Sequence, residues 1–194
     1  MTLPDWLDPL PDAEQMRATD RWAIEEQGVP SLQLMERAGR GLAALVEEVG
    51  PTGRVAILCG GGNNGGDGFV AARLLREAGR DVVVAVTTDL AKYEGDAKAN
   101  LDLLEERPRP FDPSILDGAA VAVDALLGTG FSGEVREPVR SAVEALNAAD
   151  LPVVACDVPS GVDASTGEVA GPAVRAVATG TFHAAKPGLW VAPG

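Results

Sequence analysis

The chain has 194 residues, of which 46% are hydrophobic and 4% aromatic, and its formal net charge at pH 7 is −13. This length suits one sizeable core, so we expect a single domain over residues 1–194, with N-terminal helices over 12–49 and a βα core over 54–194. A strongly acidic protein repels nucleic-acid phosphates and anionic lipid headgroups, which predicts no nucleic-acid partner and no membrane partner.

The sequence has neither a basic stretch followed by a long apolar run at its N-terminus nor an apolar run long enough to span a bilayer. We therefore expect a cytoplasmic protein. Its two cysteines, Cys59 and Cys156, each lie near the end of an apolar, strand-like segment. That position favours buried, reduced thiols.

The first elements are two predicted helices. Asp12 and Gln15 have the spacing of a capping box, and a glycine and a proline near residue 30 end the helix that follows them. Over residues 31–49, apolar residues recur every three or four positions. This periodicity predicts a second helix with one buried face.

Short apolar strands then alternate with helices. We predict strands over 54–59, 81–87, 119–123, 152–156 and 174–182, and helices over 70–78, 95–106 and 138–148. Strands separated by helices of this length imply right-handed crossovers and a parallel sheet. The sequence therefore predicts an α/β fold of three αβα layers, Rossmann-like, with a mostly parallel central sheet. Trp190-Val191 either form a short last strand or precede further residues of a longer parent protein.

The loop after the first predicted strand, residues 60–68, is rich in glycine and formally matches the spacing G-x-G-x-x-G. In a chain with 23 glycines this match is a weak signal, since accident produces roughly 0.3 such matches. We expect Asp67 to cap the next helix, where its carboxylate would compete with a pyrophosphate for the same amides. Asn63, Asn64 and Asp67 instead suit a carboxamide, ribose hydroxyls or a hard cation, and an Asx-rich turn is the purely structural alternative.

Two further strand ends carry polar residues. Asp124 follows an apolar strand, and a carboxylate there persists when it is paired, hydrogen-bonded or bound to a cation. The glycine-rich loop 128–134 offers backbone amides and is the better candidate for phosphate contact. Asp157 and Ser160 follow the next buried strand. Because the carboxyl ends of parallel strands meet at one edge of the sheet, we expect the three loops to form one ligand site.

These segments resemble the NAD(P)H-hydrate epimerases of the YjeF N-terminal domain type. The resemblance runs through GGGNNGGDGFVAARLL, VDALLGTGFSGEVREP and DVPSGVDASTG, and it extends from AEQMR at residue 13 to KPGL at residue 186. It implies an isomerase that interconverts the R and S forms of hydrated NADH and NADPH. It also implies a potassium ion as cofactor, a homodimer, and functional coupling to an ADP- or ATP-dependent hydrate dehydratase.

The resemblance also implies roles for particular residues. Asn64, Asp124 and Ser160 would hold the potassium ion, and hard oxygen donors of this kind suit such a cation. The bound cation would offset part of the repulsion between an acidic site and a diphosphate ligand. The residues implied in nucleotide contact are Asn63, Asn64, Gly65, Gly66, Asp67, Gly128, Thr129, Gly130, Phe131, Ser132, Gly133, Glu134 and Asp157.

The acidic residues are the candidates for acid–base catalysis. One carboxylic acid would protonate the ring hydroxyl as it leaves, the ring nitrogen would stabilise the resulting iminium, and water would add back to either face. Asp157 is the first candidate for this group and Asp67 the second. We interpret Lys186 as a solvated surface residue rather than a phosphate ligand, and His183, the only histidine, as a loop or strand-edge residue.

Two other classes of function are alternatives to the epimerase. A noncatalytic nucleotide-binding or scaffold module would use the same fold, but it has no physical reason to keep oxygen donors at three strand ends. An NAD-dependent oxidoreductase would explain the glycine spacing, and Asp89 lies about where a ribose-binding acid would follow the second strand. The chain shows no hydride-transfer acid and no substrate domain, so we rank this alternative lower.

Overall fold

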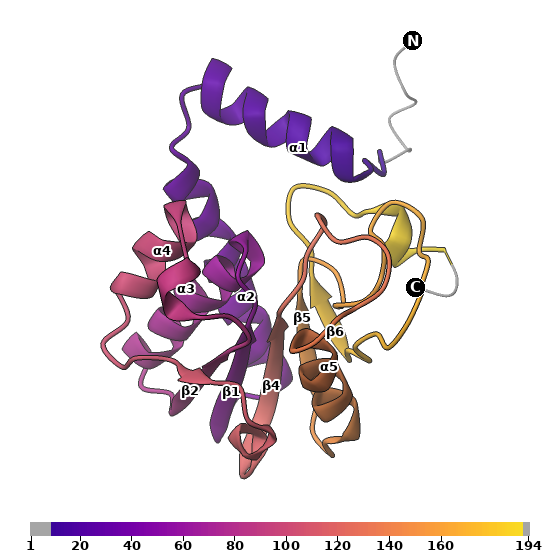
Figure 1. The fold of residues 1–194 in the computed structure, drawn as a ribbon. Helices are drawn as coiled ribbons and strands as arrows, with labels where there is room; N and C mark the ends of the chain where they lie inside the picture. The colour runs from indigo at the N-terminus through magenta and orange to yellow at the C-terminus, as the bar shows by residue number, and fades with distance from the viewer. Residues whose placement is uncertain (1–8, 192–194) are drawn as a thin grey trace.

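The computed structural model describes residues 9–191, so the start of the chain, where no export signal is predicted, lies outside the described residues. Its centre is a sheet of six strands in the order β3-β2-β1-β4-β5-β6, and every pairing is parallel. The strands are β1 (Arg54–Cys59), β2 (Val82–Val86), β3 (Arg109–Pro110), β4 (Ala119–Ala125), β5 (Val153–Cys156) and β6 (Ala178–Gly180). The predicted α/β class with a parallel central sheet is confirmed (Figure 1).

Helices cover both faces of this sheet (Figure 1). The α-helices are α1 (Ala13–Arg21), α2 (Ser31–Val49), α3 (Asn63–Glu77), α4 (Gly95–Asp102) and α5 (Val139–Ala148). Helices α2, α3 and α4 pack together on one face, and α5 lies on the other. Among the described helices, none combines the length and the apolar character that a membrane span requires.

The strand β1 shows how the sheet is buried on both sides. Val55, Ile57 and Cys59 belong to the core beneath α2 and α3, whereas Ala56 and Leu58 belong to the core beneath α5. Residues that alternate along a strand face opposite sides of the sheet, and here both sides are covered. The predicted burial of the cysteines as free thiols is confirmed for Cys59 and likewise for Cys156.

The strand order reverses between β1 and β4. From β1 the chain continues to β2 and β3 on one side, and it then returns to β4, β5 and β6 on the other. In open α/β sheets, ligands bind outside the carboxyl ends of the strands at such a reversal. We call the edge formed by these carboxyl ends the carboxyl rim. The loops after β1, β4 and β5 all lie at this rim.

The boundaries of several elements differ from the prediction. The capping box at Asp12 and the helix over 31–49 are confirmed. The strand predicted over 174–182 is only the three residues of β6. Of the two alternatives for Trp190-Val191, the short last strand is wrong, because these residues follow the 3-10 turn η4 (Pro187–Leu189) and form no strand. Proline fixes φ and removes an N–H donor, so it favours such a turn over a strand. The edge strand β3 was not predicted, because its two residues are too few to show a periodic pattern.

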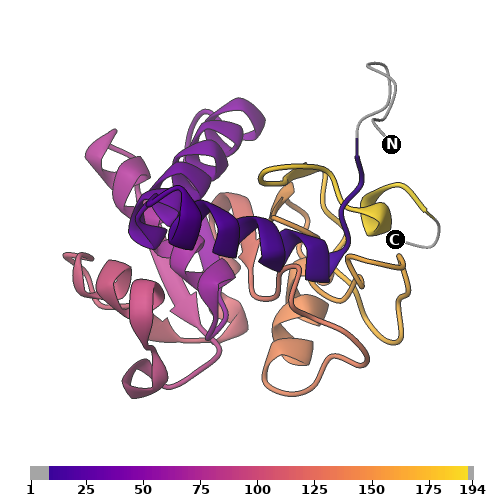
Figure 2. The same cartoon turned by 90° about the horizontal axis from the view of Figure 1, so that it is seen from above.

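Helix α1 crosses above the carboxyl rim and packs on neither face of the sheet (Figures 1 and 2). It continues into a π-helical turn, η1 (Trp22–Glu26), before Gly28 adopts a positive φ of 65°. Polar contacts hold α1 near both ends. The amide of Ala13 donates to Ser165 Oγ at 3.0 Å, and Asp20 Oδ1 lies 2.8 Å from His183 Nε2. This helix therefore forms a roof over the rim.

The packing of α2 on α3 generates a prediction. A Cβ atom added at Gly39 of α2 would lie against Val70 and 2.9 Å from the carbonyl oxygen of Asp67. We expect Gly39→Ala to lower the free energy of unfolding by about 1–3 kcal/mol, because the helices must separate. Gly41→Ala is the matched control, since its Cβ would meet only Phe182 at 3.9 Å. Chemical denaturation of both variants checks this, and equal stabilities would contradict it.

Candidate functional site

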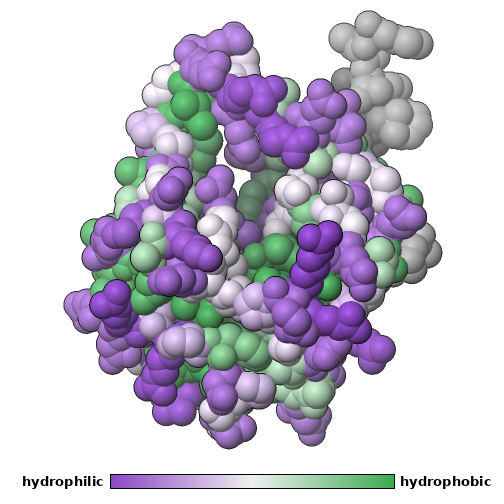
Figure 3. Space-filling view, viewed as in Figure 1, coloured by the Kyte–Doolittle hydropathy of each residue, from purple (hydrophilic) through white to green (hydrophobic). Residues whose placement is uncertain are grey.

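A cavity of about 740 Å³ lies at the carboxyl rim, beneath α1. Figure 3 shows it as a hollow between α1 and the body of the protein. The start of α3, the loop 126–132 and the segment 182–186 complete the wall. This volume is in the range of small-molecule binding sites. The cavity therefore lies where the reversal of strand order places a ligand.

The loop after β1 is shorter than predicted, because α3 already begins at Asn63. Asp67 consequently lies inside the helix, and the prediction that it caps the helix is wrong. The Asx-rich turn is also wrong, since Asn63 and Asn64 are the first two helical residues. The N-cap is Gly62, with no side-chain cap bond. The first-turn amides of α3 therefore meet the cavity without a competing carboxylate.

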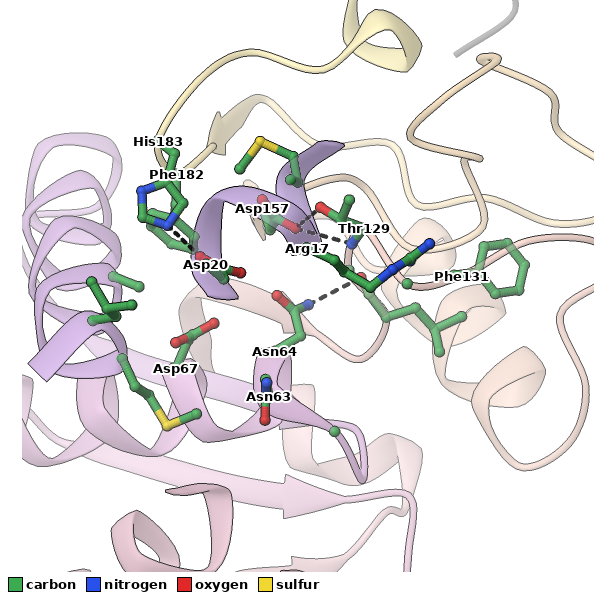
Figure 4. Close-up of a pocket in the computed structure, with 18 of the residues that line it drawn as sticks. Arg17, Asp20, Asn63, Asn64, Asp67, Thr129, Phe131, Asp157, Phe182 and His183 are labelled. Atoms are coloured by element: carbon green, nitrogen blue, oxygen red, sulfur yellow. Dashed lines mark hydrogen bonds and ion pairs between the residues drawn. The ribbon is translucent and has the colours of Figure 1, made fainter. Parts of the chain in front are cut away.

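The carboxyl group of Asp67 points into the cavity (Figure 4). It is 9% exposed and makes no hydrogen bond to any of residues 9–191. Burial raises its pKa well above the usual range, and the negative charges of Asp157 and Asp20 raise it further. The neutral acid form of Asp67 therefore persists to higher pH than that of an ordinary carboxyl group.

Asp124 lies inside β4, which extends two residues further than predicted. Its side chain is fully buried and links two strand ends: Oδ1 accepts from Ser160 Oγ at 2.6 Å, and Oδ2 accepts from Ser160 N at 2.8 Å. Burial raises the pKa of Asp124 to about 6, although the hydrogen bonds from Ser160 and Leu126 oppose the shift. The Asp124 carboxylate therefore links β4 to the turn after β5 and is not exposed to the cavity.

Hydrogen bonds through Leu127 connect Asn64, Ser160 and Asp124, the three residues implied as potassium ligands. Asn64 Nδ2 donates to the carbonyl oxygen of Leu127 at 3.0 Å, and Leu127 N donates to Ser160 Oγ at 2.9 Å. Ser160 in turn bonds to Asp124. Carboxylate, hydroxyl, carbonyl and amide oxygens thus share one location, and within residues 9–191 no ion pair compensates the buried Asp124. Such hard donors around an uncompensated carboxylate fit a hard cation.

Asp157 follows β5 directly and has a positive φ of 68°, which is uncommon for a residue other than glycine. Its Oδ1 accepts from Lys186 Nζ at 2.6 Å, and its Oδ2 accepts from Thr129 N at 3.0 Å and from the Thr129 hydroxyl. A Cβ at Gly128 would lie 3.1 Å from Asn64 Cγ and 3.2 Å from Asp157 Oδ2. Glycine therefore allows the loop to pass between these two side chains.

Lys186 is 1% exposed, so the interpretation of it as a surface residue is wrong. Its ammonium group donates to Asp157, to Thr181 Oγ1 at 2.8 Å and to the carbonyl oxygen of Phe182 at 2.8 Å. All three N–H groups are thereby used. Irregular chain wraps around Lys186, and no periodic pattern in the sequence indicates burial there. His183 lies in a loop, as predicted, with a positive φ of 61°.

The structure divides the predicted nucleotide contacts into two groups. Asn63, Asn64, Asp67, Asp157 and the loop residues 128–132 line the cavity. Four others do not line it: Gly65 and Gly66 are buried in α3, and Gly133 and Glu134 lie beyond the cavity wall. Glu134 instead forms an ion pair with Arg140 at 3.6 Å.

The residues that α1 and η1 contribute to the cavity were not predicted from the sequence. Met16, Arg17 and Asp20 of α1 line it together with Ile24 of η1, and Asp20 contacts His183 across it. The amphipathic pattern of α1 gave no reason to place this helix over the carboxyl rim. Asp89, the ribose-binding candidate of the oxidoreductase alternative, instead caps η2 (Leu90–Lys92) through a bond from Ala91 N at 2.9 Å.

The fold and this cavity define an α/β protein with a small-molecule site at the reversal of its strand order. Residues 31–188 match the family described as YjeF-related protein N-terminus. The chain therefore belongs to this family.

Relatives and a solved structure extend the comparison. A relative from Pirellula staleyi named NAD(P)H-hydrate epimerase is 41% identical over 93% of this chain and 85% of its own length. A relative from Salinibacter ruber named bifunctional NAD(P)H-hydrate repair enzyme Nnr is 44% identical over 96% of this chain, but the chain spans only 38% of that relative's length. The crystal structure of the yeast protein ynu0 superposes with a TM-score of 0.82, at 27% identity, over 94% of this chain and 83% of its own.

The buried pair formed by Lys186 and Asp157 generates a prediction. Lys186→Met leaves the Asp157 carboxylate without its cation, so we expect the free energy of unfolding to fall by about 3 kcal/mol. Lys98→Met is the control, because Lys98 pairs with Asp102 on an exposed helix surface, where a salt bridge contributes less than about 1 kcal/mol. Urea denaturation checks both variants. A loss for Lys186→Met no larger than for Lys98→Met would show that the pair does not stabilise this loop.

Proposed function

We propose that this protein is an isomerase that interconverts the R and S epimers of hydrated NADH and NADPH. The observation that carries the proposal is a cavity at the carboxyl rim in which two carboxyl groups have opposite surroundings. Asp67 has no hydrogen-bond partner among the described residues, and Asp157 accepts three hydrogen bonds. The names of the relatives from Pirellula staleyi and Salinibacter ruber support the same activity.

We assign the proton transfer to Asp67. As a neutral acid it protonates the ring hydroxyl, the C–O bond breaks to release water, and the electron pair of the ring nitrogen forms the iminium. Water then adds to the other face and returns its proton to the Asp67 carboxylate, so the enzyme ends in the protonation state in which it began. The raised pKa of Asp67 supports this role, because the acid form is available at higher pH.

Asp157 has a different task in this proposal. Its oxygens are fixed by Lys186 and Thr129, and a fixed carboxylate beside the ring stabilises the positive charge that develops on the iminium. The order of the two candidates is thus the reverse of the one that the sequence suggested. The reason is that both oxygens of Asp157 already accept hydrogen bonds, whereas Asp67 faces the cavity without a hydrogen-bond partner among residues 9–191.

A potassium ion belongs to this proposal. Asn64, Asp124 and Ser160 would hold it, and its chemical contribution is to neutralise a buried carboxylate next to an anionic substrate. We also propose that the protein acts in the cytoplasm as a homodimer, and that an ADP- or ATP-dependent hydrate dehydratase uses one of the epimers. The relatives named bifunctional support that coupling, since this chain spans 38% of their length.

Asp67→Asn tests the proton transfer. We expect it to lower kcat by roughly 100-fold or more, the usual contribution of a general acid. The assay supplies the epimer that an epimer-specific dehydratase does not use, and it follows recovery of reduced cofactor. The rate of the unmodified protein should fall as pH rises through the raised pKa of Asp67, because deprotonation removes the acid.

Two further variants serve as comparisons for Asp67→Asn. Asp89→Asn keeps the cap of η2 and should retain full activity, whereas in an oxidoreductase that binds ribose through Asp89 it would lose affinity. Asp157→Asn should also lower kcat, because it removes charge beside the ring. A near-normal kcat in Asp67→Asn would remove Asp67 from the chemistry, and a near-normal kcat in Asp157→Asn would remove Asp157.

Potassium binding makes a separate prediction. A ligand that binds only the folded state stabilises it, so saturating KCl should add about 1–3 kcal/mol to the free energy of unfolding. Choline chloride at the same ionic strength should not. Asp124→Asn lacks the only carboxylate of the proposed set and should lose the difference between the two salts. Equal effects of both salts on the unmodified protein would refute the ion site.

A further inference from the structure

The cavity presents an electrostatic problem for the substrate proposed above. A nicotinamide dinucleotide carries a diphosphate, yet the chain has a net charge of −13 and most of the charged groups in the cavity wall are acidic. The acidic residues that line the cavity are Asp20, Asp67, Asp96 and Asp157, and the lysine and arginine residues are Arg17 and Lys186. An anion bound here needs local positive charge to offset these carboxylates.

Lys186 does not supply that charge to a ligand. Its three N–H groups are used by Asp157, Thr181 and Phe182, and the side chain is 1% exposed. The charge of Lys186 is also matched by Asp157 at 2.6 Å. His183 is engaged with Asp20 at 2.8 Å. Neither residue is therefore available to a phosphate group.

Arg17 is the remaining basic side chain in the wall. It extends from α1 toward the loop that carries Thr129 and Phe131, as Figure 4 shows. Within residues 9–191 it forms no ion pair and no side-chain hydrogen bond. A guanidinium group offers five donors in a planar arrangement that matches two phosphate oxygens at once. The loop 128–132 faces Arg17. Its Thr129 N–H donates to Asp157 and its Phe131 N–H to the carbonyl oxygen of Gly128, which leaves the N–H groups of Gly128, Gly130 and Ser132 without a partner among residues 9–191.

We propose that Arg17 binds the diphosphate of the dinucleotide against the loop 128–132, so that α1 supplies the phosphate-binding charge of the site. This inference rests on the proposed function for the identity of the ligand. In this inference α1 takes part in ligand binding. The helix begins at Ala13 and precedes the part of the chain that matches the family, residues 31–188. The contacts of Ala13 with Ser165 and of Asp20 with His183 hold Arg17 over the loop.

The experiment compares two reduced ligands by calorimetry. NADH carries the diphosphate, and reduced nicotinamide riboside carries none. Arg17→Gln should weaken NADH binding roughly ten- to one-hundred-fold, the usual effect of losing a hydrogen-bonded charge. Binding of the riboside should not change. Epimerisation of NADH hydrate by the same variant should show a raised KM with little change in kcat, because Arg17 contacts no reacting atom.

Arg21→Gln is the matched control, since Arg21 lies one turn later on α1 and outside the cavity wall. It makes the same change in net charge and should leave both affinities unaltered. Arg17→Lys keeps a positive charge and should restore part of the NADH affinity. Because Arg17 is exposed, these variants should keep the thermal midpoint of the unmodified protein.

The outcomes separate this inference from the proposed function. If Arg17→Gln and Arg21→Gln weaken NADH binding equally, only net charge matters and the inference is wrong. If Arg17→Gln weakens riboside binding as much as NADH binding, Arg17 does not act on phosphate and the inference is also wrong. If the unmodified protein binds NADH through Arg17 but does not epimerise the hydrate, the inference holds and the proposed function fails.

Discussion

The buried bond between Asp124 and Ser160 is the constraint on which the site depends. It ties the end of β4 to the turn after β5, and Leu127 extends the same network to Asn64 at the start of α3. A fully buried carboxylate is costly unless its oxygens are satisfied, so the network fixes the relative positions of three chain segments. The reversal of strand order brings the three segments together, and this hydrogen-bond network fixes their positions at the carboxyl rim.

The same constraint explains why the carboxyl groups of Asp157 and Asp67, which line one cavity, differ in their hydrogen bonding. Once Leu127 is fixed, Gly128 and Thr129 follow beside Asp157, and Thr129 donates to it. Lys186 occupies the other oxygen of Asp157 from the C-terminal segment. Asp67 lies on α3, away from these donors, where burial raises its pKa. Pairs of titratable groups in unlike surroundings are the usual means by which a site separates its acid from its other charges.

The roof of the cavity is organised differently from its floor. The floor is held by buried hydrogen bonds at strand ends, whereas α1 is held by the contacts of Ala13 and Asp20 with the C-terminal segment. The contact of Asp20 with His183 is exposed and the bond from Ala13 to Ser165 is only partly buried, and polar contacts of this kind contribute little stability individually. A ligand held between the floor and the roof would therefore contribute to the position of α1 as well as being bound by it. In our proposal the reacting carboxyl groups therefore lie on α3 and in the loop after β5, whereas the positive charge that binds the phosphates lies on α1.

The sequence by itself determined the class of fold, the buried strands and the polar residues at three strand ends. These features follow from local periodicity and from the rule that parallel strands end at one rim. It also indicated Asn64, Asp124, Asp157 and Ser160 as neighbours, because each follows or ends a buried strand.

Only the tertiary structure decided how these groups are partnered. Asp67 lies within α3 rather than at its cap, because helix formation through Gly65 and Gly66 depends on close packing against other segments. Lys186 is buried although it lies in irregular chain, and Arg17 reaches the cavity because α1 crosses the rim. Contacts between residues distant in the chain leave no periodic signal in the sequence, so partners and pKa values of this kind are set by the folded arrangement alone.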